Sequence, residues 1–320
     1  MIKKKGVFLV IITLLIISVI ISLSFGSHFI SITELWNTDS GQLREIILSI
    51  RLPKTVNAIT VGALLSVAGL LIQNLVKNPL ADPYILGLSG AAAAVQLAII
   101  ASGIILPFWL FVLSGFCAAL FSMIVLIKVS SKKRLNTNSL LLSGVVIAFA
   151  YGALISLMLT LSPLASTKPM MFWLMGDLSF SSSFLYPIVL LIAGFLWVYR
   201  HHKELDLLAR GEFFAQKSGV DVKKLNMMLL ITTSVFTAAA VSMAGTIGFV
   251  GLVVPHICRM LVGNVHAILI PLSMVVGAIV LLISDVFART IVAPIQLPVG
   301  VFTALFGVPV FLFLLRKKHD

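Results

Sequence analysis

Charged residues are scarce in this chain of 320 residues, where they make up 11% of the sequence against 60% hydrophobic residues. Soluble domains contain about 25% charged and about 45–50% apolar residues. No water-soluble fold buries so large an apolar fraction, so the composition excludes a soluble enzyme, a secreted module and a disordered linker. We expect an all-α integral membrane protein.

Cysteine and the motifs of catalysis are also sparse. Cys117 and Cys258 lie inside apolar runs, so they provide neither a disulfide framework nor metal-ligand spacing. The sequence contains no Gly-Lys dipeptide, and therefore no P-loop, and it has no H-E-x-x-H motif. We predict no catalytic residue and no bound metal. Any ATP hydrolysis that drives this chain is expected in another subunit.

Long uncharged runs are what the sequence has in abundance. A helical span needs about 20 apolar residues. The expected spans are 7–25, 55–75, 84–105, 107–127, 139–161, 184–199, 227–247, 250–263, 267–287 and 298–315. The first run resembles a signal peptide, but it exceeds a typical hydrophobic region and is interpreted as a span. About ten spans leave no room for a sizeable soluble domain, so residues 1–320 are predicted to form one transmembrane domain.

The net charge of +12 is explained by orientation rather than by nucleic-acid binding. On this threading, 18 of the 23 basic residues lie on one side of the membrane. The five on the other side are Arg44, Arg51, Lys54, Lys168 and Arg289. Because basic residues concentrate in cytoplasmic loops, both termini are predicted to be cytoplasmic.

One motif occurs twice in the chain. Ser66-Val67-Ala68-Gly69, Pro79 and Gly87 recur 176 residues later as Ser242-Met243-Ala244-Gly245, Pro255 and Gly263. The two copies start in spans of opposite direction, which is typical of inverted-repeat transporters. We predict a first repeat at 55–161 and a second at 227–315. Chance is the alternative, because Ser, Ala and Gly are common in membrane helices.

Few ionisable residues lie within the spans, which disfavours an ion-coupled transporter. Asp285 and Arg289 are four residues apart on one helix face, and we interpret them as an ion pair near the outer end. His256 is interpreted as a hydrogen-bonding group between helices, since no second metal ligand lies at helical spacing. An intramembrane enzyme centred on His256 is a further alternative.

The longest polar stretch, at 200–225, is predicted to be cytoplasmic. Leu207-Leu208 and Phe213-Phe214 alternate with charges, Gly211 interrupts the run, and Gly219 is typical of a helix C-cap. Two short amphipathic helices fit this pattern. They could lie on the lipid surface or form a docking platform for a cytoplasmic protein, and the composition leaves both open.

This stretch carries a family resemblance. Residues 205–212 with Gly219 resemble the coupling loop of permeases in the vitamin B12, ferric-siderophore and haem ABC importers. Further collinear matches are Arg51-Leu52-Pro53-Lys54, Gln73 with Asn78–Pro83 and Gly87, Leu140–Gly144, Phe172–Gly176, Ala244–Arg259, Asp285 with Ala288-Arg289, Leu297–Gly300 and Gly307–Phe311. The resemblance runs from about residue 30 to the C-terminus.

The resemblance implies a ten-helix permease that pairs with a second copy or a close paralogue, with spans five and ten near the dimer axis. Cytoplasmic ABC ATPase subunits, which carry ATP and Mg, would bind the coupling loop. An extracytoplasmic solute-binding protein would deliver a metal chelate to the cytoplasmic membrane. The chain itself would need no cofactor, and a ferric siderophore is the expected substrate, with cobalamin and haem as alternatives.

The matched motifs also imply residue roles. The expected ATPase-coupling residues are Leu207, Leu208, Ala209, Arg210, Gly211, Glu212 and Gly219. Arg51, Lys54 and Arg289 are expected on the outer face to receive acidic side chains of the binding protein, with Lys54 in place of the family's usual arginine. Asn78, Leu80, Thr137 and Asn138 match positions expected at the inner gate. Gly263–Ala267 departs from the family's Asp-His-Arg run.

Overall fold

The structure is a computed structural model that describes residues 2–26, 29–31, 44–130, 137–179 and 185–317. Its described residues form helices joined by turns and short loops, with no strand among them. In chain order the elements are α1 (Ile2–Ser24), the π-helical turn η1 (Ile46–Arg51), α4 (Leu52–Val76), the 3₁₀ turn η2 (Pro83–Leu86), α5 (Leu88–Ser102), α6 (Phe108–Ser130), α7 (Thr137–Leu161), α8 (Leu164–Leu174), α9 (Leu185–Arg200), α10 (His202–Ala209), α11 (Glu212–Lys217), α12 (Val222–Ala244), α13 (Val250–Val262), α14 (His266–Thr290) and α15 (Val299–Lys317).

Each predicted span coincides with an apolar helix. Six of the helical stretches in the described residues are long and apolar enough to cross a membrane, and they contain α1, α4, α6, α7, α12 and α14. Four shorter apolar helices, α5, α9, α13 and α15, occupy the other predicted positions. The all-helical membrane fold is therefore confirmed, whereas the count of ten crossings stays a prediction.

Local chemistry explains where helix boundaries differ from the prediction. α12 begins at Val222 rather than 227 because the Asp221 carboxylate accepts a hydrogen bond from the Lys224 backbone N–H at 3.1 Å and caps the helix. α5 starts at Leu88 rather than 84 because Pro83 and Gly87 bound the separate turn η2. The sequence analysis did not predict α8, whose Trp173 is fully buried.

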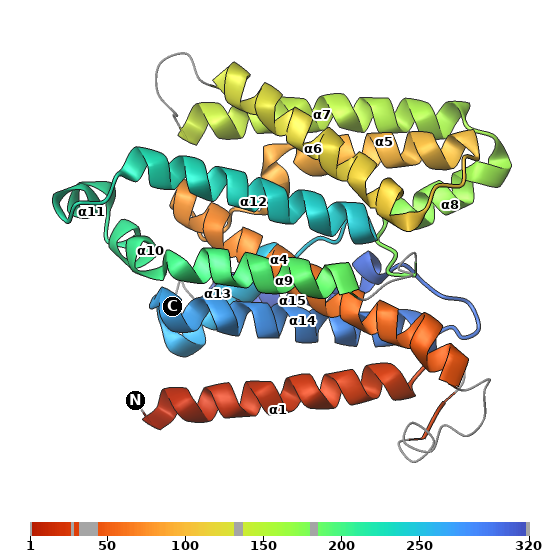
Figure 1. The fold of residues 1–320 in the computed structure, drawn as a ribbon, viewed down its shortest axis with the longest axis horizontal. Coiled ribbons are helices and arrows are strands. Elements are labelled where there is room, and N and C mark those ends of the chain that lie inside the picture. The colour runs from red at the N-terminus through yellow and green to blue at the C-terminus, as the bar shows by residue number, and fades with distance from the viewer. Residues whose placement is uncertain (1, 27–28, 32–43, 131–136, 180–184, 318–320) are drawn as a thin grey trace.

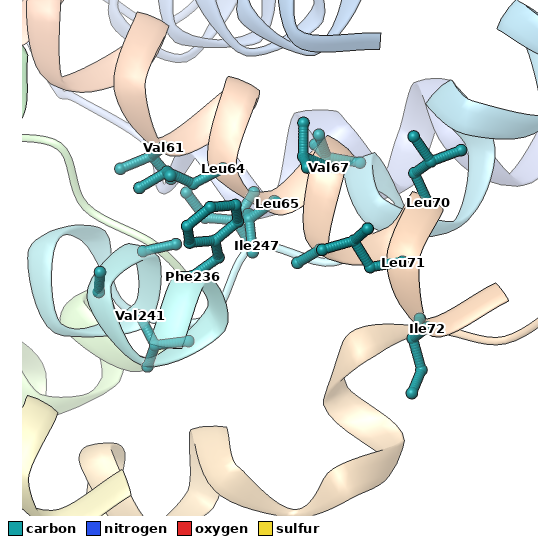
Figure 2. Close-up of a cluster of buried hydrophobic side chains, with 14 of the residues drawn as sticks. Val61, Leu64, Leu65, Val67, Leu70, Leu71, Ile72, Phe236, Val241 and Ile247 are labelled. Atoms are coloured by element: carbon teal, nitrogen blue, oxygen red, sulfur yellow. The ribbon is translucent and has the colours of Figure 1, made fainter. Parts of the chain in front are cut away.

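α4 is the central helix, and most of its residues are buried. It packs against α12, α13 and α14, and Figure 2 shows Leu64, Leu65 and other α4 side chains beside Phe236 and Val241 of α12. Two glycine contacts make this packing close. A Cβ atom at Gly62 would lie 2.3 Å from the Gly277 carbonyl oxygen, and one at Gly69 would lie 1.8 Å from that of Gly251. Small residues thus bring α13 and α14 against the central helix.

α4 and α12 run in opposite directions, as Figure 1 shows. The repeated motif nevertheless differs locally between them. The glycines differ, because Gly69 lies inside α4 whereas Gly245 follows the end of α12. The prolines differ as well, because Pro79 lies in a turn whereas Pro255 lies inside α13. The inverted repeat stays a prediction.

One end of the bundle collects the elements expected in the cytoplasm. The start of α1, the end of α15 and the pair α10–α11 lie at the same end of the molecule (Figure 1). The end of η1, the start of α4 and the end of α14, which carry Arg51, Lys54 and Arg289 respectively, lie at the opposite end. We call these the coupling end and the outer end.

Candidate functional site

The polar stretch at the coupling end forms two short helices, as the sequence predicts. Gly211 separates α10 from α11 with a φ of +116°, and Gly219 follows α11 with a φ of +87°. Both values lie in the region that glycine adopts at little cost. Asp221 then caps α12, and the pKa of Asp221 is lowered because the Lys224 N–H donates to its carboxylate.

The predicted ATPase-coupling residues divide between two faces. Leu208 of α10 is buried with Leu205, and Leu207 is half-buried. Ala209, Arg210, Glu212 and Gly219 are exposed, and Gly211 between the helices is half-buried. The pair of helices is therefore anchored by leucines and presents small and charged residues outward.

Two exposed aromatic residues on α11 were absent from the predicted coupling set. Phe213 is 71% exposed and Phe214 is 43% exposed. Lys217 Nζ lies 4.6 Å from the Phe213 ring centroid, and the Arg210 guanidinium lies 5.6 Å from that of Phe214. Large apolar side chains exposed beside charges are typical of a surface that contacts another protein or a membrane. The Phe-Phe pair between charged residues was the sequence signal for it.

A hydrogen-bond chain joins α10 to the body of the protein. Asp206 Oδ1 accepts hydrogen bonds from the His266 backbone N–H at 2.8 Å and from His266 Nδ1 at 2.7 Å. On the other side of the ring, His266 Nε2 lies 2.8 Å from Asn74 Nδ2. Because Asn74 Nδ2 is a donor, Nε2 acts as the acceptor and the proton resides on Nδ1. The buried imidazole thus links α10, α14 and α4.

Gln73, the residue before Asn74 on α4, makes a second set of hydrogen bonds. Gln73 Nε2 donates to the Leu252 carbonyl oxygen at 3.2 Å and to the Ala81 carbonyl oxygen at 3.4 Å. Its Oε1 accepts a hydrogen bond from Arg259 of α13. Ala81 belongs to the turn after α4. Adjacent residues of α4 therefore contact this turn through Gln73 and, through Asn74 and His266, the pair α10–α11, which we call the coupling helices.

The turn at 77–82 contains two of the predicted gate residues. Asn78 Oδ1 accepts a hydrogen bond from the Leu80 backbone N–H at 2.9 Å, and both residues are exposed. Lys77, with a φ of +56°, forms a 2.9 Å salt bridge to Glu212 of α11. A second link therefore joins the coupling helices to this turn.

The other two predicted gate residues begin α7. Asn138 is exposed, and the side chain of Thr137 lies outside the described part of the structure. α7 packs closely on η2, because a Cβ at Gly144 would lie 2.3 Å from the Ile85 carbonyl oxygen. The structure thus joins α7 to the turn that follows Asn78 and Leu80.

A polar cavity of about 280 Å³ lies where these elements meet. Its walls come from the end of α4, the junction between α10 and α11, and the facing residues of α13, of α14 and of the loop between them. The residues that carry the network, Gln73, Asn74, Arg259 and His266, line it together with Lys77 and Gly211.

The outer end contains a buried cluster of charges. Asp285 is 1% exposed and binds two cations, Lys54 Nζ at 3.3 Å and Arg289 Nη2 at 3.0 Å. Arg289 also donates to the carbonyl oxygen of Ser22 at 2.9 Å. Arg51 donates to the Ser24 carbonyl oxygen at 2.7 Å. The predicted Asp285–Arg289 ion pair is confirmed.

The exposure expected for the three basic residues is corrected by the structure. Arg51, Lys54 and Arg289 are between 5% and 8% exposed, because the end of α1 covers both arginines and Asp285 pairs with Lys54 and Arg289. Their role in docking a binding protein stays a prediction. Docking would require that the chain uncover them.

His256 does not stand in a metal-binding group. It lies half-buried within α13, after Pro255. In the described part of the chain, no group of three or more His, Cys, Asp or Glu side chains is arranged to hold a metal ion.

Comparison with known proteins identifies the family. The sequence profile of the FecCD transport family matches residues 14–317. The chain belongs to the FecCD transport family. It is therefore a multi-pass membrane permease, as its sequence predicts.

Curated relatives cover almost the whole FecCD chain. An uncharacterized ABC transporter permease, YvrB of Bacillus subtilis (strain 168), is 38% identical, over 95% of this chain and 92% of the relative. The vitamin B12 import system permease BtuC of Vibrio vulnificus (strain CMCP6) is 34% identical, over 99% of this chain and 96% of the relative.

Solved structures share the FecCD fold. An inward-facing conformation of a putative metal-chelate type ABC transporter matches with a TM-score of 0.87 and 29% identity, covering 98% of this chain and 99% of the other. PsaBC from Streptococcus pneumoniae in complex with Fab matches with a TM-score of 0.58 and 17% identity, covering 88% of this chain and 95% of the other, which shows a likeness of fold alone.

Proposed function

We propose that this chain is the permease subunit of an ATP-driven importer that moves a metal chelate across the cytoplasmic membrane. Cytoplasmic ABC ATPase subunits would hold ATP and Mg and bind α10–α11. An extracytoplasmic solute-binding protein would deliver the chelate to the outer end. Membership of a transport family that includes ABC permeases supports this proposal.

The observation that carries the proposal is the network at the coupling end. The chain Asp206–His266–Asn74 joins α10 to the end of α4, and the Lys77–Glu212 salt bridge joins α11 to the turn at 77–82. Gln73, next to Asn74 on α4, binds Ala81 of the same turn. Movement of α10–α11 therefore pulls on the end of α4 and on the turn that contains Asn78 and Leu80. An ATPase that shifts these helices would open or close the inner gate through those contacts.

The excess positive charge at the outer end supports the proposal that a binding protein docks there. Lys54 and Arg289 share one carboxylate, Asp285, so these three residues carry a net charge of +1. Acidic side chains arriving from outside would balance this excess positive charge. Once uncovered, the cluster would attract such a partner in a salt-dependent way.

A second permease copy is proposed to pair through α7 and α15, the fifth and tenth apolar helices. Most of α7 is not buried in the single chain. Phe149 and Leu161 of α7 and Leu312 and Phe313 of α15 are well exposed. The second copy or a paralogue would cover these faces and enclose the pathway, leaving both termini in the cytoplasm with α10–α11.

The substrate is proposed to be a metal chelate. A ferric siderophore is the first candidate, expected from the family that the sequence resembles. Cobalamin is the second candidate, favoured by the relatives that are vitamin B12 permeases, and haem is the third. Radiolabelled ferric siderophore, cobalamin and haem offered in turn to proteoliposomes that contain the full transporter would identify the substrate by ATP-dependent uptake.

The coupling network is tested by Asp206→Leu in the reconstituted transporter with its ATPase and binding protein. This change removes the acceptor of two hydrogen bonds and leaves buried donors of His266 unpaired, which costs about 1–3 kcal/mol. We expect chelate uptake per ATP hydrolysed to fall about tenfold, while basal ATP hydrolysis continues. Asp206→Asn keeps an acceptor oxygen and should stay within about twofold of the wild type.

Glu204→Leu is the matched control, because Glu204 is exposed on the same helix and takes no part in the network. Equal coupling in Asp206→Leu and Glu204→Leu would contradict the proposed route. Uptake that collapses with an ionophore at constant ATP would instead favour an ion-coupled transporter.

A further inference from the structure

An apolar groove of about 670 Å³ lies on the surface between α9 and α12. One face of α9, from Leu190 to Trp197, forms one wall. One face of α12, from Lys224 to Phe236, forms the other. The lining positions follow helical spacing on both helices, so the groove runs along the two helices rather than across them.

A small residue leaves this hollow open, and a glycine brings its two walls together. Ala193 is exposed on α9, whereas a Cβ at Gly194 would lie 2.9 Å from the Phe236 ring of α12. Within the wall, Trp197 Nε1 donates a hydrogen bond to Thr232 Oγ1 at 3.1 Å. Because this donor is already paired inside the wall, the groove offers mainly hydrocarbon surface to an occupant.

Among the residues that the structure describes, one charged residue lines the groove, and it stands at one end. Lys224 is 87% exposed at the start of α12, with a 3.5 Å salt bridge to the exposed Asp221. The same end of the bundle contains Arg200, Lys203 and Lys223, together with Glu204, so positive charge predominates there. Trp197 and Tyr199 lie near this end, where aromatic residues mark the membrane–water interface.

The length of the groove fits one leaflet of a bilayer. Lys224 and Phe236 are twelve residues apart on α12, which corresponds to about 18 Å along a helix. The hydrocarbon core is about 30 Å thick, so a chain from one leaflet extends about 15 Å into it. An acyl chain that enters at the Lys224 end would fill the groove.

We propose that this groove binds an anionic phospholipid of the cytoplasmic leaflet, with one acyl chain along α9 and α12 and its phosphate at Lys224. The leaflet rests on the orientation proposed above, in which this end is cytoplasmic. A second copy of the chain is a poorer occupant. A two-fold axis along the membrane normal would bring the same basic ends together, and like charges repel.

The test is native mass spectrometry of the purified chain in detergent, titrated with phosphatidylglycerol or phosphatidylcholine. We expect one phosphatidylglycerol to bind more tightly than phosphatidylcholine. Lys224→Gln should weaken phosphatidylglycerol binding about fivefold, the effect expected of one lysine near anionic lipid, and leave phosphatidylcholine binding unchanged. Lys223→Gln is the matched control, because Lys223 is also exposed but does not line the groove.

Ala193→Trp fills the groove and should reduce the binding of both lipids, and Ala193→Leu should reduce it less. Melting temperatures close to that of the wild type establish that these variants fold. Equal effects of Lys224→Gln and Lys223→Gln, or undiminished lipid binding by a folded Ala193→Trp, would overturn the proposal. The measurement needs no ATPase or binding protein, so its failure leaves the proposed transport function standing.

Discussion

Asp285 holds together two cations that come from different helices. Its carboxylate is almost fully buried and pairs with Lys54 of α4 and Arg289 of its own helix, α14. Arg289 also binds the end of α1 through Ser22. A buried ion pair adds little stability by itself, but removing one partner leaves the other as an uncompensated charge. The arrangement at the outer end therefore depends on this one carboxylate.

Asp285→Asn should destabilise the protein by about 3–5 kcal/mol, because Lys54 and Arg289 remain buried without a carboxylate. The melting temperature of the purified chain in detergent measures this effect. Asp221→Asn provides a control, since the Asp221–Lys224 pair is exposed and should contribute little. If the two variants melted at the same temperature, Asp285 would not have the structural role inferred here.

The coupling helices show how two short elements combine anchoring with an exposed contact surface. Leu205, Leu208 and Ala215 face the protein interior, whereas Phe213 and Phe214 face outward. Helices of eight and six residues have little stability alone. Their position is set by these buried side chains and by the hydrogen bonds of Asp206.

Phe213→Ala should weaken ATPase binding about 30-fold, because exposed aromatic anchors at the centre of an interface contribute about 2 kcal/mol or more. Binding of the purified ATPase to the detergent-solubilised permease provides the measurement. Phe121→Ala is the matched control, since Phe121 is 65% exposed on α6. Unchanged ATPase affinity in Phe213→Ala would exclude this residue from the interface.

Periodicity predicted the elements that depend on local sequence. The two coupling helices follow from alternating apolar and charged residues and from Gly211 and Gly219. The helix α8 was missed, because its 11 residues include Lys168 and Pro169 and are too short for a span. It is stabilised by contacts of Met170 and Trp173, which are fully buried. Such burial cannot be seen before the neighbouring helices are placed.

The whole molecule has two different ends, and both the sequence and the structure distinguish them. The excess of basic residues predicts which side is cytoplasmic, and the structure places the start of α1, the end of α15 and α10–α11 at one end (Figure 1). With this orientation, Lys217 lies inside the cell and Ile105, which is 96% exposed between α5 and α6, lies outside.

Lys217→Cys should react with a membrane-impermeant maleimide only in inverted vesicles, and Ile105→Cys only in intact spheroplasts. Both substitutions are made after Cys117 and Cys258 have been replaced by serine and alanine. Labelling is read by mass shift on a gel. The reverse pattern would invert the proposed topology and place α10–α11 outside the reach of an ATPase.

The sequence by itself determined that this chain lies in lipid. It also determined which segments form apolar helices and at which residue α10 and α11 are separated. These properties depend on composition and on neighbours within a few turns of one helix. Only the tertiary structure decided that Arg51, Lys54 and Arg289 are buried, and that His266 meets Asp206 and Asn74, 60 and 192 residues away. Contacts over such distances arise when helices pack, and no local pattern of residues records which helices become neighbours.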